Sequence, residues 1–246
     1  MQTRDVLPSP DLPPWVLGLT FVEAPQGGVR HLMPAPWISV GFRFAGEADL
    51  RTRHRWQRLP WHTVAGLQTR ARQMRTAPGG LLLVARLHPA TAPAFSPEPA
   101  GLVDATVALR CRGPAAVEAA DDGARLQLVE GLLRERLAAC APPDPLAVEA
   151  IDRIRAERGQ VRVDALAKAL GVSADTLGRR VKAATGVPPK QFAAIARLHA
   201  AFVAPADDLT GRALEAGYFD QPHFNAHVRR TTGLAPSALL APDAAC

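Results

Sequence analysis

The sequence predicts an α+β protein of two domains, in which a β-rich domain precedes an all-α domain. Short apolar runs bounded by proline and glycine fill the region up to residue 110, and such runs are typical of strands in a barrel or sandwich. From residue 146 onward, apolar residues recur at helical spacing instead. Between the two regions, the sequence APPDP at 141–145 places three prolines in four positions. We therefore expect domains over residues 1–143 and 144–246.

Composition supports a folded chain and says little about its partner. With 246 residues, 48% hydrophobic and 21% charged, the chain has ample material for a core. The net charge of +6 is a weak indication of nucleic acid over this length. The three cysteines, Cys111, Cys140 and Cys246, form no CxxC pattern, so neither a disulfide framework nor a zinc site is indicated. The cysteine pattern fits a reducing compartment. We find no apolar run long enough to span a bilayer and no signal-peptide pattern, so we expect a cytoplasmic protein without a membrane partner.

The first domain is expected to consist of strands and one closing helix. The apolar runs that we expect to be strands are 15–22, 37–44, 64–67, 81–87 and 102–109. Residues 50–58 alternate in polarity and predict an exposed strand or a hairpin, with Arg51, Arg53 and Arg55 on one face. That face could bind phosphate, but a solvated polar face is favoured. Over 121–140, leucines and a valine recur at helical spacing, which predicts a helix that packs on the β-rich domain or on a partner subunit.

The second domain begins with a short helical unit that has clear end signals. A helix over 163–170 is expected to end at Gly171, because glycine tolerates the left-handed conformation of a C-cap. Ser173 can then cap the next helix, whose inward residues are Leu177 and Val181 and which stops at Gly186. Two helices joined by so short a turn form a helix-turn-helix, whose second helix can lie in a DNA major groove. The outer face of that helix is rich in cationic side chains, as base and phosphate contacts require.

A second unit of the same layout follows. Asp208 can cap a helix that ends at Gly217, and Asp220 can cap the next, with Phe224 and Val228 directed inward. Its outward positions include Gln221, His223, Asn225 and His227, with Arg229 and Arg230 near the end. A linker helix over 188–204 would span about 25 Å and hold the two recognition helices in successive major grooves.

These residues resemble a known family. The segments GVSADTLGRRVKAATGVPPKQF and EAGYFDQPHFNAHVRRTTGLAPSALL are similar to the tandem helix-turn-helix domain of AraC/XylS-type transcriptional regulators, over residues 146–241. Residues 64–110 are similar to the β-rich sensor domain that precedes this domain in one subgroup of regulators. The resemblance implies a sequence-specific DNA-binding regulator with an effector-binding or dimerising first domain. Double-stranded operator DNA is the implied partner, and RNA polymerase, a small-molecule effector and a second copy of the chain stay open as others.

The resemblance and the exposed faces together give a set of candidate DNA-contacting residues. The family's base-facing positions fall on Asp175, Gly178 and Arg179 in the first helix, and on residues 221–223, 225 and 226 in the second. We expect Arg179 to read a base and Arg180 and Lys182 to hold phosphates. The full candidate set is Asp175, Thr176, Arg179, Arg180, Lys182, Gln221, His223, Asn225, Arg229 and Arg230.

Three departures from the family pattern leave an alternative open. Gly178 has no side chain to contact a base, Arg212 stands where the family has an apolar residue, and Ala226 removes one polar reader. The alternative is a small-molecule-binding or enzymatic β domain that carries a degenerate helical module without DNA binding. We expect no catalytic site, metal or cofactor, because no nucleophile–base pair or metal-ligand spacing is present.

Several single residues have two interpretations. The histidines of the first domain, His31, His54, His62 and His88, share no ligand spacing, so packing or solvent exposure is favoured for them. For His223, base contact and bracing of the turn are both open. The four tryptophans could line an apolar ligand pocket, although packing is favoured for each.

Overall fold

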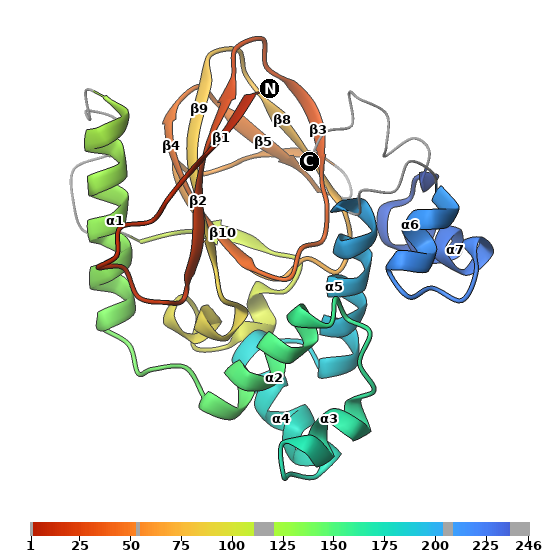
Figure 1. Cartoon of the computed structure of the whole chain (residues 1–246). Coiled ribbons are helices and arrows are strands. Elements are labelled where there is room, and N and C mark those ends of the chain that lie inside the picture. Colours follow the sequence, from red (N-terminus) through yellow and green to blue (C-terminus); the bar gives the residue numbers. More distant parts are fainter. Residues whose placement is uncertain (1, 53–54, 111–120, 204–208, 237–246) are drawn as a thin grey trace.

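The computed structural model describes residues 2–52, 55–110, 121–203 and 209–236, and it confirms a β-rich region followed by a helical one (Figure 1). The predictions for Arg53, His54, Cys111, Asp208 and Cys246 lie outside these residues. Two antiparallel sheets face each other, six-stranded in the order β1-β2-β9-β4-β7-β10 and four-stranded in the order β3-β8-β5-β6. Their strands are β1 (Gln2–Val6), β2 (Val16–Ala24), β3 (Gly28–Leu32), β4 (Ile38–Ala45), β5 (Ala48–Arg51), β6 (Trp56–Arg58), β7 (His62–Ala65), β8 (Arg72–Thr76), β9 (Gly80–Leu87) and β10 (Thr106–Ala108).

Most of the apolar runs are strands, and the hairpin over residues 50–58 is present as β5 and β6. The prediction for 102–109 is wrong in its first half, because Pro99–Leu102 forms a 3-10 helix (η2) and pairing with β7 begins only at Thr106. The sequence analysis missed β1, β3 and β8. These strands carry few apolar residues, since each is exposed or lines an internal space, so no apolar run marks them.

The six-stranded sheet packs its core on its outer face. In β4, Ile38, Val40 and Phe42 are buried in the main hydrophobic cluster, whereas the alternate residues Ser39 and Gly41 face the space between the sheets. Because side chains alternate along a strand, one face can be packed while the other stays small and polar. Most residues with this second orientation are too small or too polar to fill the space between the sheets.

Helix α1 (Asp122–Ala138) lies along one side of the β-rich region (Figure 1). Of the two placements predicted for it, on the β-rich domain or on a partner subunit, the structure shows the first. Val129 and Leu133 are buried in the main cluster, and Arg136 Nε donates to the carbonyl of Ala94 at 2.9 Å. Ala94 ends a 3-10 helix (η1, Pro89–Ala94). The helix is therefore held by contacts within the chain.

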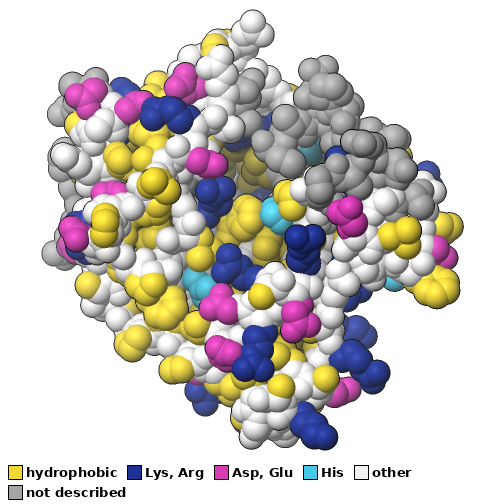
Figure 2. All heavy atoms as spheres, viewed as in Figure 1, with side chains coloured by type: hydrophobic (Ala, Val, Ile, Leu, Met, Phe, Trp, Pro, Cys, Tyr) yellow, Lys and Arg dark blue, Asp and Glu magenta, His cyan; other side chains and the backbone are white. Residues whose placement is uncertain are grey.

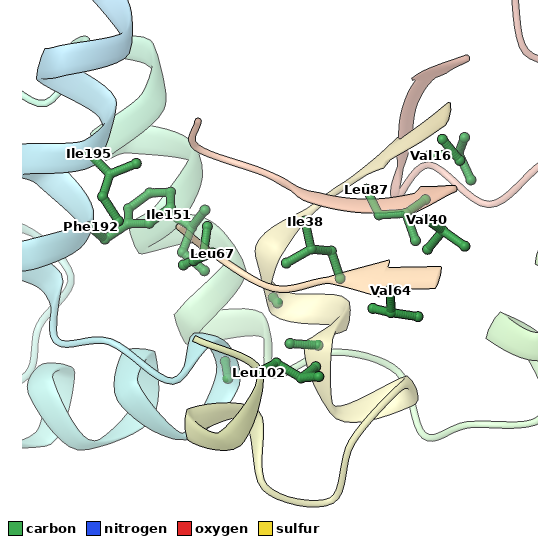
Figure 3. Close-up of a cluster of buried hydrophobic side chains, with 14 of the residues drawn as sticks. Val16, Ile38, Val40, Val64, Leu67, Leu87, Leu102, Ile151, Phe192 and Ile195 are labelled. Carbon is green, nitrogen blue, oxygen red and sulfur yellow. The ribbon is translucent and has the colours of Figure 1, made fainter. Parts of the chain in front are cut away.

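The helical region contains α2 (Pro145–Ala156), α3 (Val163–Ala169), α4 (Ala174–Thr185), α5 (Pro189–Val203), α6 (Leu209–Glu215) and α7 (Gln221–Thr232). Its first part shares a core with the β-rich region. Figure 3 shows Ile151 of α2 and Phe192 of α5 on the side of the cluster that continues through Leu67 to Ile38 and Leu102. The first part of the helical region thus packs directly on the β-rich region through apolar contacts and is not joined to it by the linker alone.

A second, smaller cluster lies around α6 and α7. Its buried members are Leu198, Ala201, Ala213, Ala216, Tyr218, Phe224 and Val228. From the β-rich region, Met33 packs against it, and the Ala71 amide donates to the Thr231 carbonyl at 2.9 Å. This end of the helical region consequently has its own core and few links to the sheets.

Candidate nucleic-acid interface

The first helix-turn-helix consists of α3 and α4, with the end signals that the sequence predicts. Gly171 in the turn has a φ of 69°, which glycine adopts without strain. The Ser173 hydroxyl accepts a hydrogen bond from the Thr176 amide at 3.1 Å and caps α4. Leu177 and Val181 are fully buried. The opposite face of α4 is consequently directed outward.

The outward face of α4 combines a braced arginine with an open lysine. The Arg179 guanidinium lies 3.2 Å from the Asp175 carboxylate, and both side chains are exposed. Such a surface pair contributes little stability, but it orients the guanidinium along the helix. Lys182 is exposed one turn further along, and nothing lies within 4 Å of the position that a Cβ would take at Gly178. This face is therefore free of contacts from the rest of the described chain near Gly178.

Arg180 has a partner within the protein. Its guanidinium donates two hydrogen bonds to the Asp144 carboxylate, one of them at 2.6 Å from Nη2. The same carboxylate accepts from the Leu146 amide at 3.1 Å and caps α2. The hydrogen bond from Arg180 lowers the pKa of Asp144, so the carboxylate is charged. A phosphate would have to compete with Asp144 for this guanidinium.

The second helix-turn-helix consists of α6 and α7 and has the same local parts. Gly217 has a φ of 73°, and the Asp220 carboxylate accepts from the His223 amide at 2.7 Å. Phe224 and Val228 are buried. The side chains of His223, Arg229 and Arg230 are exposed, whereas those of Gln221 and Asn225 are partly exposed. The cap uses only the backbone amide of His223, and the exposed imidazole lies edge-on to the Tyr218 ring, with the ring centroids 5.5 Å apart.

His227, predicted on the outward face, is only partly exposed and has a partner within the protein. Its Nδ1 lies 2.7 Å from the hydroxyl of Tyr218, which belongs to the smaller hydrophobic cluster. Burial lowers the pKa of His227 to about 4, with further lowering by Arg230, His223 and Arg197. Burial raises the pKa of Tyr218, so the hydroxyl keeps its proton and can donate a hydrogen bond to the neutral imidazole. The pair braces the turn of the second unit.

Arg212, the departure from the family pattern in α6, has a structural partner. Its Nη1 donates to the carbonyl of Phe202 at 3.1 Å, near the end of α5. A cation suits this position, because the last carbonyls of a helix lack intrahelical donors. Helix α5 has 15 residues, or about 22 Å of axis, close to the predicted strut.

A cavity of about 660 Å³ opens between the sheets and is walled in part by α5. His199, Phe202 and Val203 of α5 line it opposite residues of both sheets, and Figure 2 looks onto a hollow bordered by basic and apolar side chains. Trp37 also lines it, so for this tryptophan the pocket interpretation holds rather than packing alone. Its size is that of pockets for small organic ligands.

Charged side chains lie in the wall of this cavity, and the sequence analysis did not single them out. Arg30, Arg72 and Arg86 come from β3, β8 and β9. Burial lowers the pKa of His199 to about 4, with smaller contributions from Arg155 and Arg86, so its imidazole is neutral. Arginines at inward-facing strand positions are a signal that the alternation of the strands could have given.

One histidine of the β-rich region, His88, has clear structural partners. His88 is buried, caps η1 by accepting from the Ala90 amide at 3.2 Å, and lies 3.3 Å from the Asp152 carboxylate. Burial lowers its pKa. Packing, the favoured interpretation, is thus what the structure shows for His88.

Among the residues the structure describes, no three His, Cys, Asp or Glu side chains are grouped to hold a metal. No described helix has the length and hydropathy needed to cross a membrane.

Comparisons with known proteins agree on this architecture. A family model described as "Helix-turn-helix domain" matches residues 166–241. No curated protein sequence matches the chain. Among solved structures, ToxT from Vibrio cholerae is similar with a TM-score of 0.53, at 10% identity over 97% of each chain.

Two further ToxT structures show the same likeness. ToxT from Vibrio cholerae O395 gives a TM-score of 0.53 at 11% identity, over 89% of this chain and 95% of that one. Unsaturated fatty acid-bound ToxT from strain SCE256 gives 0.51 at 11% identity, over 94% and 97%. At these identities the likeness shows that the two-part fold is shared.

Proposed function

We propose that this chain is a DNA-binding transcription regulator of the AraC type, in which α4 and α7 lie in successive major grooves of one operator. The observation that carries this proposal is the repetition of one design. Each recognition helix follows a capping residue, buries its apolar residues on one face and presents cationic side chains on the other. A linker helix of about 22 Å joins the two units.

We assign distinct roles to the exposed side chains. Arg179 reads a base, since a braced guanidinium can donate two hydrogen bonds to guanine. Lys182 and Arg180 hold phosphates on the first half-site. Arg180 gives up its ion pair with Asp144 when it binds the phosphate. On α7, His223 reads the second groove beside Gln221 and Asn225, while residues 229 and 230 hold the backbone. Asp175 and Thr176 orient Arg179 through the ion pair and a 3.4 Å hydrogen bond.

Selected operator DNA provides the test. Sites selected from a random duplex pool should contain two half-sites about one helical turn apart. Arg179→Ala should weaken binding to the selected site by about 1–3 kcal/mol and relax preference at one base pair. Lys182→Ala should weaken all sequences alike and lower the salt slope by about one. Equal losses on selected and random DNA for Arg179→Ala would contradict the base-reading role.

We also propose that the cavity between the sheets takes a small-molecule effector. Its α5 wall supports this role, because α5 is also the helix that joins the two DNA-binding units. A ligand in contact with α5 can therefore favour one arrangement of the recognition helices over another. A ToxT structure of the same fold holds an unsaturated fatty acid. RNA polymerase and a second copy of the chain stay predictions from the family resemblance.

The domain boundaries, 1–143 and 144–246, remain our proposal. The stretch between α1 and α2 is irregular and proline-rich, which supports a junction there. The shared hydrophobic core means that the two domains would form one packed unit in this state.

The alternative, a β domain with a helical module that does not bind DNA, is motivated by Gly178 and Ala226. We assign no catalytic activity to either domain. A gel-shift titration with random-DNA competitor separates the two functions. Absence of any selectively bound duplex, with the protein folded by circular dichroism, would favour the alternative.

A further inference from the structure

We propose that Arg43, together with Arg30, forms a binding site for a carboxylate or an oxyanion of similar size. The site lies between the sheets, near the turns that join β4 to β5 and β8 to β9. The proposal rests on the proposed effector cavity and names the chemistry of the group that binds there. It does not depend on DNA binding.

Arg43 lies in β4 at a position that points between the sheets. Ser39, Gly41, Arg43 and Ala45 alternate with the buried core residues of the same strand, and all four line the internal spaces. The Arg43 residue is only 6% exposed. Strand alternation thus places a guanidinium where a packed sandwich would have an apolar side chain.

The guanidinium of Arg43 has donors left over. Its Nη2 donates to the Leu59 carbonyl at 2.7 Å, and its carbon lies 4.7 Å from the centre of the Trp61 ring. Nε and Nη1 are buried and have no hydrogen-bond partner within the described protein. A guanidinium keeps its charge, so buried donors without an acceptor carry a desolvation cost that an anion would remove.

Two arginines of the larger cavity, Arg72 and Arg86, are already engaged. Arg86 pairs with Asp5 at 3.3 Å, and Arg72 donates to the Thr106 hydroxyl at 3.0 Å. The contrast indicates that Arg43, rather than either of these, awaits a ligand.

The charge around Arg43 favours an anion. Arg30 lines the same small space, and burial lowers its pKa to about 10. Burial also lowers the pKa of Arg43, as does the neighbouring Arg58. The nearby carboxylates, Glu47 and Asp49, both pair with Arg58, and Asp49 also pairs with an arginine of β8 at 2.9 Å. Described residues lining the small space include no carboxylate, so its net charge is positive.

The space beside Arg43 has the size of one small oxyanion. Its volume is about 70 Å³, whereas a water molecule occupies roughly 30 Å³ of the liquid. It adjoins the larger cavity, with which it shares the lining residues Val22, Arg30, Leu59, Thr63, Met74 and Leu82. An acid could therefore place its carboxylate at Arg43 and the rest of its structure in the larger cavity. The planar fork of a guanidinium suits a carboxylate, which can accept two parallel hydrogen bonds.

Calorimetric titration of the full chain tests the site with acetate, octanoate and the neutral octanol. We expect octanoate to bind more tightly than octanol, and Arg43→Met to weaken octanoate binding by about tenfold or more while leaving octanol unchanged. Arg55→Met is the matched control, because Arg55 is exposed and lines neither space. Arg43→Lys should retain part of the octanoate affinity through its charge.

Thermal unfolding adds a readout that does not depend on affinity. Arg43→Met removes an unsatisfied buried charge, so the ligand-free variant should melt at the same or a higher temperature. Saturating octanoate should raise the Tm of the unsubstituted chain more than that of Arg43→Met. Acetate binding as tightly as octanoate would support the oxyanion site and assign it to a free small anion instead of an acidic effector.

Three results would overturn the site: no carboxylate binding, equal octanoate affinity in the folded Arg43→Met variant, or equal affinity for octanoate and octanol. The last two would indicate an apolar pocket with water at Arg43. Octanoate binding that leaves operator affinity unchanged would support the site and contradict only the effector role. Octanoate binding without any operator binding would contradict the regulator function and leave the site standing.

Discussion

The two helix-turn-helix units have the same local design and different supports. In the first, α4 packs on η1 and η2, and Leu177 belongs to the cluster that continues into the sheets. A Cβ at Gly186, which ends α4, would lie 2.6 Å from the Pro99 carbonyl oxygen, which shows how closely the two regions approach. In the second unit, α7 has its own small cluster and little contact with the sheets.

This difference teaches that the two recognition helices depend on different parts of the molecule. The position of α4 is fixed by the β-rich region, whereas that of α7 is fixed mainly by α5 and α6. Local stability follows the size of the supporting core, so the second unit should open more readily than the first. A ligand that moves α5 would accordingly displace α7 more easily than α4.

Removing the largest buried side chain of each unit gives the largest expected effect. Phe224→Ala should cost about 3–5 kcal/mol, and the loss should stay within α6 and α7. Leu177→Ala should cost about 2–5 kcal/mol and destabilise the β-rich region as well, since the core is shared. Hydrogen exchange on both variants provides the measurement. Loss of protection in the strands of Phe224→Ala would contradict the separate support of the second unit.

Acid should weaken the second unit through His227. The pKa of His227 is about 4 when folded and 6.5 when unfolded, so its neutral form stabilises the fold above pH 6.5. That contribution is lost as the pH falls from 6.5 toward 4, by about 1–2 kcal/mol near pH 5. The first unit, residues 163–187, contains no histidine. Amide exchange of α7 at pH 5 and 7.5 measures the effect.

The matched variant for this experiment is His227→Asn, whose amide oxygen can accept from Tyr218 without titrating. It should flatten the pH dependence of α7. Unchanged acid sensitivity of α7 in the His227→Asn variant would show that the titration of His227 does not govern the second unit.

Asp144→Ala should change stability and DNA binding in opposite directions. Loss of the α2 cap should cost about 0.5–2 kcal/mol in denaturant unfolding. Release of Arg180 should raise affinity for random duplex DNA, because its guanidinium no longer has a carboxylate to leave. Glu149→Ala is the control, since it breaks the exposed 2.7 Å pair with Arg153 on the same helix. Weaker DNA binding by a folded Asp144→Ala protein would contradict the phosphate role of Arg180.

The smallest expected effect is a gain. Gly178→Ala should stabilise α4 by about 0.5–1 kcal/mol, because nothing lies within 4 Å of the added Cβ. Gly131→Ala in α1, also open, serves as the comparison for stability without DNA contact. Thermal unfolding should show the same gain in stability for both variants. Duplex titration should show unchanged DNA affinity for both. A large loss of affinity for Gly178→Ala alone would mean that DNA approaches the α4 backbone there.

The sequence predicted the helical region far better than the cavity. Ser173 and Asp220 cap the helices where expected, and Gly171 and Gly217 lie in the turns with positive φ. These signals act over three or four residues, so a single sequence contains them completely. The partner of His227 was not predicted, because Tyr218 precedes the helix and lies outside the helical repeat.

The sequence by itself therefore determined that a β-rich region precedes a helical one, where the helices of the second region are capped, and which residues of α4 and α7 are buried. Tertiary structure alone decided that Arg43 and Arg30, from two facing sheets, line one small space, and that Asp144 holds Arg180 from 36 positions away. The physical reason is range. Periodicity and capping are local, whereas a cavity exists only where strands distant in sequence are held apart by the packing of their outer faces.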